Sequence, residues 1–137
     1  MLADDIVEQA ADAIIFANRE GTIDRWNAAA TAVFGFPAAE AIGQNLDLII
    51  PPPLRDAHWR GWEAAMERGQ LRLNGKPTLT RGQHRDGRKL YVEMSFALVR
   101  GDDGTPCGSV AIARDVTERV EREKAARLAS AAAKPAS

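Results

Sequence analysis

The sequence predicts an α+β domain in which a five-stranded antiparallel sheet carries short helices on one face. Two observations support this class: two strand segments and then three more flank a central helical stretch, and tight turns separate neighbouring strands. The length of 137 residues suits a single domain. Hydrophobic residues make up 45% of the chain and charged residues 27%, as in ordinary globular proteins.

The N-terminal quarter alternates helix and strand signals. Residues 1–10 can form a short amphipathic helix, because apolar side chains recur there at helical spacing. Residues 13–17 have the character of a buried strand, and the alternating residues 22–26 complete a hairpin with it. Asn27 can cap a helix over about 28–34.

The longest helix inside the domain is expected after three consecutive prolines, over about residues 54–68. Its apolar residues recur at helical spacing and define one face, which includes a histidine. This face comprises Leu54, His58, Gly61, Trp62 and Ala65.

Three strands are expected in the second half, over about 78–84, 89–100 and 107–115. Residues 85–87 and 101–104 form the turns between them, so the last two strands should be antiparallel neighbours. The middle strand alternates, which predicts one face towards the helices. That face consists of Leu90, Val92, Met94, Phe96 and Leu98.

The chain becomes helical and heavily charged from Thr117. Asp115 or Thr117 can cap this helix by accepting from backbone N–H groups two or three residues on. Val116 and Val120 stand four residues apart, on one face, available to a partner helix or to the sheet edge.

We therefore divide the chain into a domain over residues 1–118 and an outgoing helix that begins the segment 119–137. The small residues over 130–137 predict a disordered tail.

Composition excludes several classes of function. A net charge of −1 gives no reason to expect nucleic acid or an anionic membrane as a partner. The longest apolar runs are too short for a membrane span, and no signal peptide is evident, so a cytoplasmic location is expected. One cysteine, Cys107, excludes an intrachain disulfide and a Cys-rich metal site. No HExxH segment, P-loop or paired-carboxylate cleft is present, so we expect no enzyme.

The order of these elements, with certain short segments in place, resembles the PAS family of sensory domains. The resemblance covers roughly residues 4–118 and implies a module that binds a small ligand, or none, and passes strain to an effector or a dimer partner. A homodimer is expected on this basis. The matching segments are DAIIF (12–16), GTIDRWN (21–27), AAATAVFGF (28–36), IGQN (42–45), RDG (85–87) and ARDVTE (113–118).

The stretch IPPPLRDAH (50–58) is similar to the proximal-ligand segment of the haem-binding, oxygen-sensing PAS domains of the FixL type. That resemblance implies b-type haem, with His58 as the metal ligand and Arg72 or Arg55 in reach of the propionates. It also places Thr78 where the FixL-type distal pocket carries an arginine, and threonine is the shorter and weaker donor.

Other side chains complete the candidate cofactor site. Trp62 is expected to pack inward, and Trp59 to face the sheet edge or a partner. Met94 and Phe96 can line the pocket from the central strand. Met94 is a candidate axial ligand, although a strand methionine is more often core filler.

Two further interpretations stay open beside haem. His58 can be a core histidine hydrogen-bonded to backbone in a cofactor-free module for dimerisation and signal relay, or the pocket can hold a small organic metabolite. A flavin-based light sensor of this fold would need a reactive cysteine before the long helix, where residues 45–50 contain none.

Overall fold

The computed structural model describes residues 1–71 and 76–133, and its elements follow the predicted order. The sheet strands are antiparallel and lie in the order β2-β1-β5-β4-β3. No helix in the described part of the chain is long and apolar enough to cross a membrane. The elements are α1 (Leu2–Gln9), β1 (Ala13–Asn18), β2 (Ile23–Trp26), α2 (Ala28–Phe34), α3 (Ala38–Ala41), the 3-10 turns η1 (Leu46–Ile49) and η2 (Pro52–Leu54), α4 (Arg55–Arg68), β3 (Thr78–Gln83), β4 (Lys89–Arg100), β5 (Pro106–Asp115) and α5 (Thr117–Ala133).

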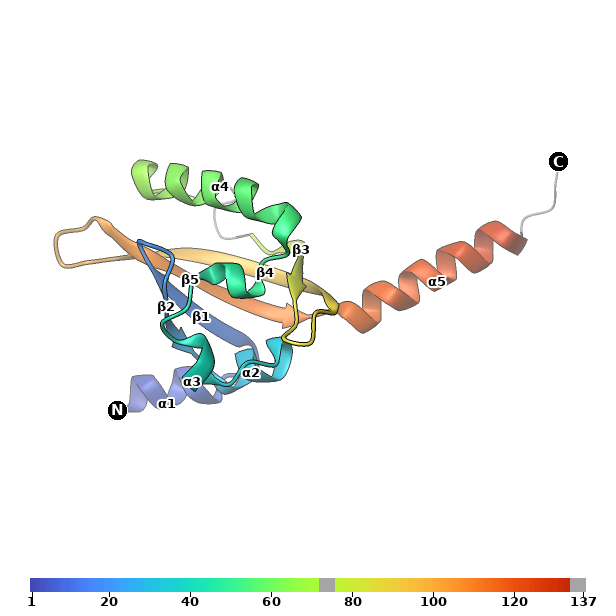
Figure 1. Ribbon diagram of the computed structural model, residues 1–137, viewed down its shortest axis with the longest axis horizontal. Helices are drawn as coiled ribbons and strands as arrows, with labels where there is room; N and C mark the ends of the chain where they lie inside the picture. Colours follow the sequence, from blue (N-terminus) through green and yellow to red (C-terminus); the bar gives the residue numbers. More distant parts are fainter. Residues whose placement is uncertain (72–75, 134–137) are drawn as a thin grey trace.

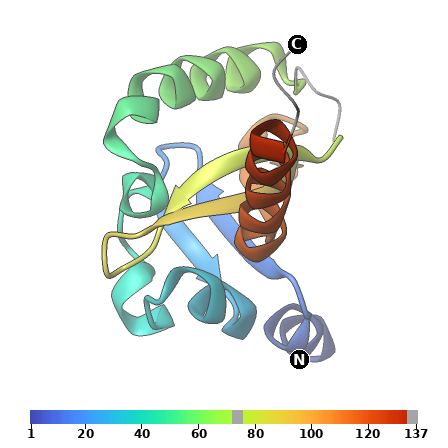
Figure 2. The same ribbon diagram turned by 90° about the vertical axis from the view of Figure 1, so that its right-hand side faces the viewer.

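The arrangement in space separates the two terminal helices. Helix α5 leaves the end of β5 and points away from the sheet (Figure 1). Viewed along α5, helix α4 crosses one end of the domain and α1 lies at the other (Figure 2). The space between α4 and the sheet is bounded by side chains of that helix and of the strands that face it.

The predicted register of β4 and β5 is confirmed. The two strands pair directly, with Met94 opposite Ala113 and Leu98 opposite Ser109. The inner face of β4 is the predicted one, since Leu90, Val92 and Met94 are buried and Phe96 and Leu98 are half-buried. A slip of one residue would have turned this face to solvent.

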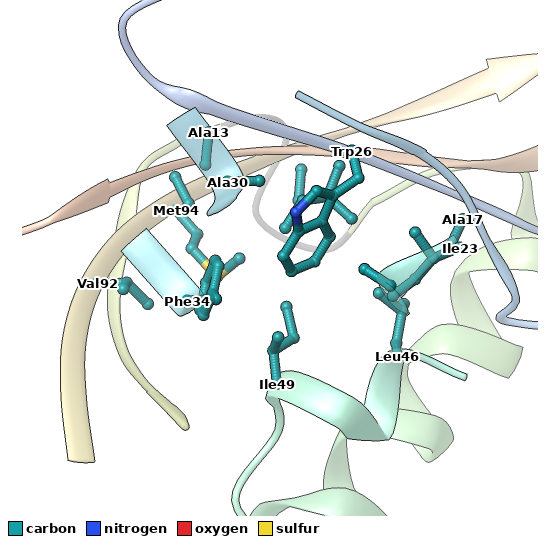
Figure 3. Close-up of a cluster of buried hydrophobic side chains, with 14 of the residues drawn as sticks. Ala13, Ala17, Ile23, Trp26, Ala30, Phe34, Leu46, Ile49, Val92 and Met94 are labelled. Carbon is teal, nitrogen blue, oxygen red and sulfur yellow. The ribbon is translucent and has the colours of Figure 1, made fainter. Parts of the chain in front are cut away.

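The core lies between the inner face of the sheet and the short helices. Trp26 at the end of β2 packs on Phe34 of α2, with ring centroids 5.8 Å apart, and the two rings point towards one another (Figure 3). The indole nitrogen of Trp26 donates to Thr31 Oγ1 and to the Phe36 carbonyl, both at 3.0 Å. These contacts attach α2 to the sheet edge.

The inner face of α4 is the predicted one except at Gly61: Leu54, His58 and Trp62 line the cavity described below, and Ala65 is buried. Gly61 is exposed, while Met66 is buried and Trp59 packs against the core. The helix is turned because both of its indole side chains find anchoring contacts on the domain, and a glycine offers no side chain to bury.

The prediction of a disordered tail is wrong for residues 130–133, because α5 continues through Ala133. Alanine has the highest helix propensity, and the end of the helix is rich in it. The remaining four residues of the predicted tail, 134–137, lie outside the described residues.

One buried side chain joins three elements. Asn27 is 1% exposed, and its Oδ1 accepts from the Ile14 N–H (2.9 Å) and the Ala30 N–H (3.0 Å). Its amide nitrogen donates to the carbonyls of Val7 (2.8 Å) and Asp12 (3.0 Å). The residue is thus the predicted cap of α2 and also a tie to α1 and β1.

We expect Asn27→Ala to lower the free energy of unfolding by about 3 kcal/mol, because buried backbone groups lose their partners together with the cap. Urea denaturation monitored by circular dichroism measures the change. Asn45→Ala is the matched control: Asn45 is an exposed cap with one hydrogen bond, to the Asp47 N–H, and its loss should cost about 1 kcal/mol or less. Equal costs for the two variants would contradict this account.

Candidate functional site

A cavity of about 380 Å³ lies between α4 and the inner face of the sheet. This volume falls within the range of small-molecule pockets, and most of the wall is apolar. The roof comes from η2 and α4, the floor from β1, β4 and β5, and the sides from α2, η1 and β3. The lining residues are Ile15, Phe34, Leu46, Ile49, Ile50, Leu54, Ala57, His58, Trp62, Thr78, Thr80, Arg81, Gly82, Val92, Met94, Phe96, Ser109 and Ala111.

The structure brings five of the predicted site residues to this one cavity. His58 and Trp62 line it from α4, Thr78 from β3, and Met94 and Phe96 from β4. The sixth, Arg72, lies outside the described residues.

Arg55, the other arginine considered for the propionates, does not line the cavity. Its Nε donates to the Ile50 carbonyl (3.0 Å) and one terminal nitrogen donates to the Asp47 carbonyl (3.1 Å). The guanidinium therefore holds the start of α4 against η1.

Helix α4 is held over the cavity by its two tryptophans. Trp62 Nε1 donates to the Arg19 carbonyl at 2.9 Å, and Trp59 Nε1 donates to Asp47 Oδ1 at 2.8 Å. The Trp59 ring lies over Gly21 in the β1–β2 turn, where an added Cβ would stand 2.3 Å from a ring carbon. Trp59 thus faces the end of the edge hairpin, and only glycine leaves it room there.

His58 is the basic side chain in the roof of the cavity. Its ring stands edge-on to Trp59, with centroids 4.6 Å apart, and lies 6.0 Å from Trp62. Nδ1 is buried without a hydrogen-bond partner among the described residues, which costs about 1–3 kcal/mol for such a group.

The charge of His58 follows from this environment. Burial lowers the pKa of the imidazole below 6.5, because the charged form loses its water, and the Asp47 carboxylate opposes the shift in part. The ring is therefore neutral at pH 7. A neutral imidazole has a free lone pair on one nitrogen, which is the form that binds a metal.

Hydroxyl groups supply other polar contacts of the cavity, whose lining also includes the exposed Arg81 of β3. Thr78 Oγ1 lies 3.5 Å from the Lys76 carbonyl, a long contact, and Thr80 is half-buried. Ser109 is buried on the floor, and the sequence analysis missed it. Its place in the inward alternation of β5, beside Ala111 and Ala113, was the signal that could have found it.

The sulfur and metal chemistry available here is limited. Cys107 is exposed at the start of β5 and does not line the cavity. Within residues 1–71 and 76–133, no group of three or more His, Cys, Asp or Glu side chains could hold a metal ion.

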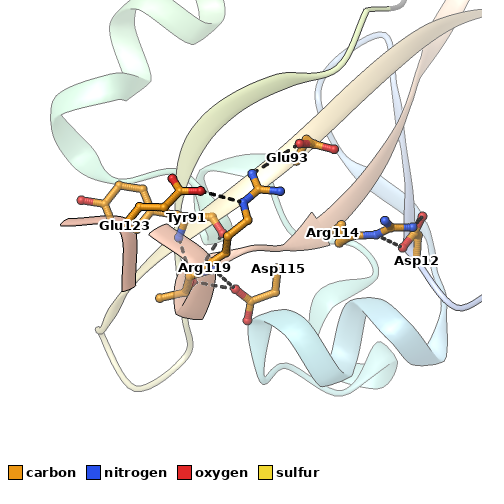
Figure 4. A network of polar contacts seen from close by, with 8 residues as sticks. Asp12, Tyr91, Glu93, Arg114, Asp115, Arg119 and Glu123 are labelled. Atoms are coloured by element: carbon orange, nitrogen blue, oxygen red, sulfur yellow. Dashed lines mark hydrogen bonds and ion pairs between the residues drawn. The ribbon is translucent and has the colours of Figure 1, made fainter. Parts of the chain in front are cut away.

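The floor of the cavity is connected to the outgoing helix through β4. Tyr91, three residues before Met94, accepts at its carbonyl from the Val116 N–H (2.9 Å), and its own N–H donates to Thr117 Oγ1 (2.9 Å). The predicted cap is present: Asp115 Oδ1 accepts from the Thr117 N–H at 2.9 Å and from its hydroxyl at 2.6 Å (Figure 4).

Side chains extend this junction along α5. Lys124 donates to the Tyr91 hydroxyl and lies 4.5 Å from the ring centroid, and these contacts lower the pKa of the Tyr91 phenol. Arg119 is 3.6 Å from Glu93 of β4. Val120 is buried. The valines of the exit segment thus pack on this chain and are not free for a partner.

Comparison with known proteins agrees with this geometry. The model of the PAS fold family matches residues 7–121. The oxygen sensor protein DosP of Escherichia coli is 28% identical over 89% of this chain, which corresponds to 15% of DosP. The sensor protein FixL of Bradyrhizobium diazoefficiens is 28% identical over 82% of this chain and 22% of its own length. The chain therefore spans less than a quarter of either relative.

Solved structures show the same fold. A PAS domain from Colwellia psychrerythraea superposes with a TM-score of 0.75 at 22% identity, covering 85% of this chain and 96% of that domain. An RNA-binding light-oxygen-voltage receptor gives a TM-score of 0.71 at 27% identity, covering 94% of this chain and 36% of the receptor.

The lowered pKa of His58 predicts a pH-dependent loss of stability. Above pH 6.5 the neutral ring is favoured in both states; below it the unfolded chain binds a proton that the folded chain resists. The wild type should therefore lose more stability between pH 7.5 and 5.5 than His58→Leu, with a contribution of at most about 1.4 kcal/mol per pH unit. Urea denaturation across this range tests it.

His84→Gln changes the other histidine of the chain and is the control. It should lose as much stability between pH 7.5 and 5.5 as the wild type does. An equally steep fall in His58→Leu would show that His58 does not resist protonation in the folded state.

Proposed function

This chain belongs to the PAS fold family, and we propose that its sensory domain binds b-type haem with His58 as the axial protein ligand. The observation that carries the proposal is the His58 imidazole, neutral and unpaired at Nδ1, in the roof of a largely apolar cavity. When bound, haem supplies an iron that binds small gases or changes oxidation state.

The residues around His58 fit a flat, apolar prosthetic group. Trp62 and Phe96 supply aromatic surface from opposite walls, and the remaining lining is mostly aliphatic. The anchoring of α4 at Asp47 and Arg19 fixes the position of the imidazole. Met94, on the floor, would be a second side chain able to contact the bound group.

The names of two relatives support a sensory role. DosP is an oxygen sensor protein and FixL a sensor protein, and the similarity of this chain to both supports the proposal of gas or redox sensing. Thr78 borders the cavity in the place of a distal arginine, so we propose that any distal hydrogen bond here is weaker than an arginine would give.

A second candidate is a small organic metabolite in the same cavity. The hydroxyls of Thr80 and Ser109 favour it, because they offer hydrogen bonds that a purely apolar group would not use. A third is a cofactor-free relay module, which the contacts of β4 with Thr117 and Lys124 favour.

We propose that the signal leaves through β4 and α5. A ligand that moves Met94 displaces the strand on which Tyr91 holds Val116 and Thr117. The recipient is proposed to be an effector domain or a second copy of the chain in a homodimer, as in two-component signalling. The proposed role is cytoplasmic and does not include catalysis by this chain.

Addition of hemin should give a sharp Soret band, and His58→Ala should shift or abolish it. Loss of a residue that hydrogen-bonds a metal ligand typically weakens metal binding by about 10- to 100-fold. Loss of the ligand His58 itself should therefore weaken hemin binding by at least that factor. His84→Ala is the matched control and should leave the band in place. Absence of hemin binding by the wild type would overturn the haem proposal, and an unchanged band in His58→Ala would overturn the ligand assignment.

Thr117→Ala should loosen the start of α5 without unfolding the domain. Loss of the hydroxyl contacts to Asp115 and Tyr91 should cost about 1 kcal/mol and speed hydrogen exchange over residues 117–126 roughly fivefold. Thr105→Ala is a close control, because Thr105 makes the same two bonds to Asp103, at 3.0 and 2.7 Å, in the β4–β5 turn.

Removal of residues 119–137 should in turn change the oligomeric state or the response to hemin. Fast exchange across 117–126 in the wild type, together with no effect of truncation, would remove the case for α5 as the output element.

A further inference from the structure

Ser109 is a polar residue in an apolar part of the sheet. It is 6% exposed and points inward from β5, with Ala17 of β1 and Leu98 of β4 as its neighbours across the strands. The inward positions that follow it on β5 are Ala111 and Ala113. Serine differs from these alanines by one oxygen, so the hydroxyl is the feature that needs an explanation.

The Ser109 hydroxyl has no hydrogen bond within the part of the chain that the structure describes. The other buried polar side chain there, Asn27, makes four. Ser109 also lines the cavity, so the direction left to its hydroxyl is the cavity itself. The hydroxyl oxygen is not closed off from that space, because His58 Nδ1 alone is buried without a partner among the described side chains. A bound molecule can therefore accept or donate a hydrogen bond at this oxygen.

His58 and Ser109 define two polar points on opposite walls. The imidazole lies in the helical roof and has an unpaired Nδ1, while the hydroxyl lies in the strand floor. Between them the wall is formed mainly by aliphatic and aromatic side chains. A molecule that fills this space meets apolar surface around its body and a hydrogen-bonding group on the sheet side.

We propose that the Ser109 hydroxyl hydrogen-bonds the ligand of this cavity, and that the cavity selects flat, largely apolar molecules with a hydroxyl, carbonyl or ring heteroatom facing the sheet. The inference rests on the proposed function only in that the cavity holds a ligand. It names Ser109 as a specificity-determining residue and applies to haem and to an organic metabolite alike.

The test uses p-cresol and p-xylene, which have similar shape and differ by a hydroxyl in place of a methyl group. Dissociation constants come from amide chemical shifts in α4 and β5 during titration of the wild type, Ser109→Ala and Ser95→Ala. Ser95 stands on the outer face of β4, so its substitution is the matched control. Thermal unfolding of the three ligand-free proteins is measured in parallel.

Ser109→Ala should weaken p-cresol binding about tenfold relative to p-xylene, as expected for a lost hydrogen bond. The ligand-free variant should unfold at the wild-type temperature or above it, because the substitution removes no hydrogen bond within the described protein. Ser95→Ala should leave the ratio of the two constants unchanged.

Three results would overturn the inference: equal weakening of both probes, a lower unfolding temperature of ligand-free Ser109→Ala, or no shift at the cavity with either probe. The haem proposal is judged separately with hemin. A protein that ignores hemin but loses its preference for p-cresol in Ser109→Ala refutes haem and supports Ser109 as the ligand contact. A protein that binds hemin through His58 but keeps its preference for p-cresol in Ser109→Ala supports haem and refutes Ser109 as the ligand contact.

Discussion

The site depends on the attachment of α4 by the indole nitrogens of Trp59 and Trp62. Each donates to an oxygen of another element, Asp47 in η1 and Arg19 in the β1–β2 turn. These bonds hold the helix across the sheet while smaller side chains beneath it leave space for a cavity. Without them, the hydrophobic effect alone would favour collapse of the helix onto the floor.

Strand β4 is the second constraint, because its two faces serve different purposes. Met94 lies at the cavity on one face, whereas the Tyr91 side chain on the other face contacts Lys124 of α5. The backbone N–H of Tyr91 also donates to Thr117 at the start of that helix. Because successive side chains point to opposite faces, a shift of the strand moves side chains on both faces together. This gives a physical route from the cavity to α5 that needs no additional moving part.

Much of the fold was readable from the sequence, since strand alternation and turn residues are local signals. The inner face of β4, the Asn27 cap and the Asp115 cap were predicted on these grounds. The face of α4 was predicted only in part. Helical spacing could not show that Trp59 finds a carboxylate and a glycine in remote segments, and this contact turns Gly61 outward.

The candidate site was also predicted only in part. His58, Met94 and Phe96 followed from a family resemblance and from periodicity. Ser109 was missed although it shares the inward face of β5 with Ala111 and Ala113, because serine is a residue type that is mostly exposed. The helical residues 130–133 were missed because small residues were interpreted as disorder, although alanine favours helix. The first error concerns a residue that the fold places at the cavity, whereas the second overlooked a local helix propensity.

The pairing of the first strand with the last has a consequence for protein architecture. Ala13 at the start of β1 lies opposite Ala113 near the end of β5, and Asp12 forms an ion pair with Arg114 at 3.1 Å. The polypeptide thus enters the sheet at the start of β1 and leaves it at the end of β5, and these two points are neighbours. A domain with this geometry can be inserted between flanking segments while keeping their junctions adjacent, so evolution can exchange such domains as cassettes without rebuilding what lies on either side.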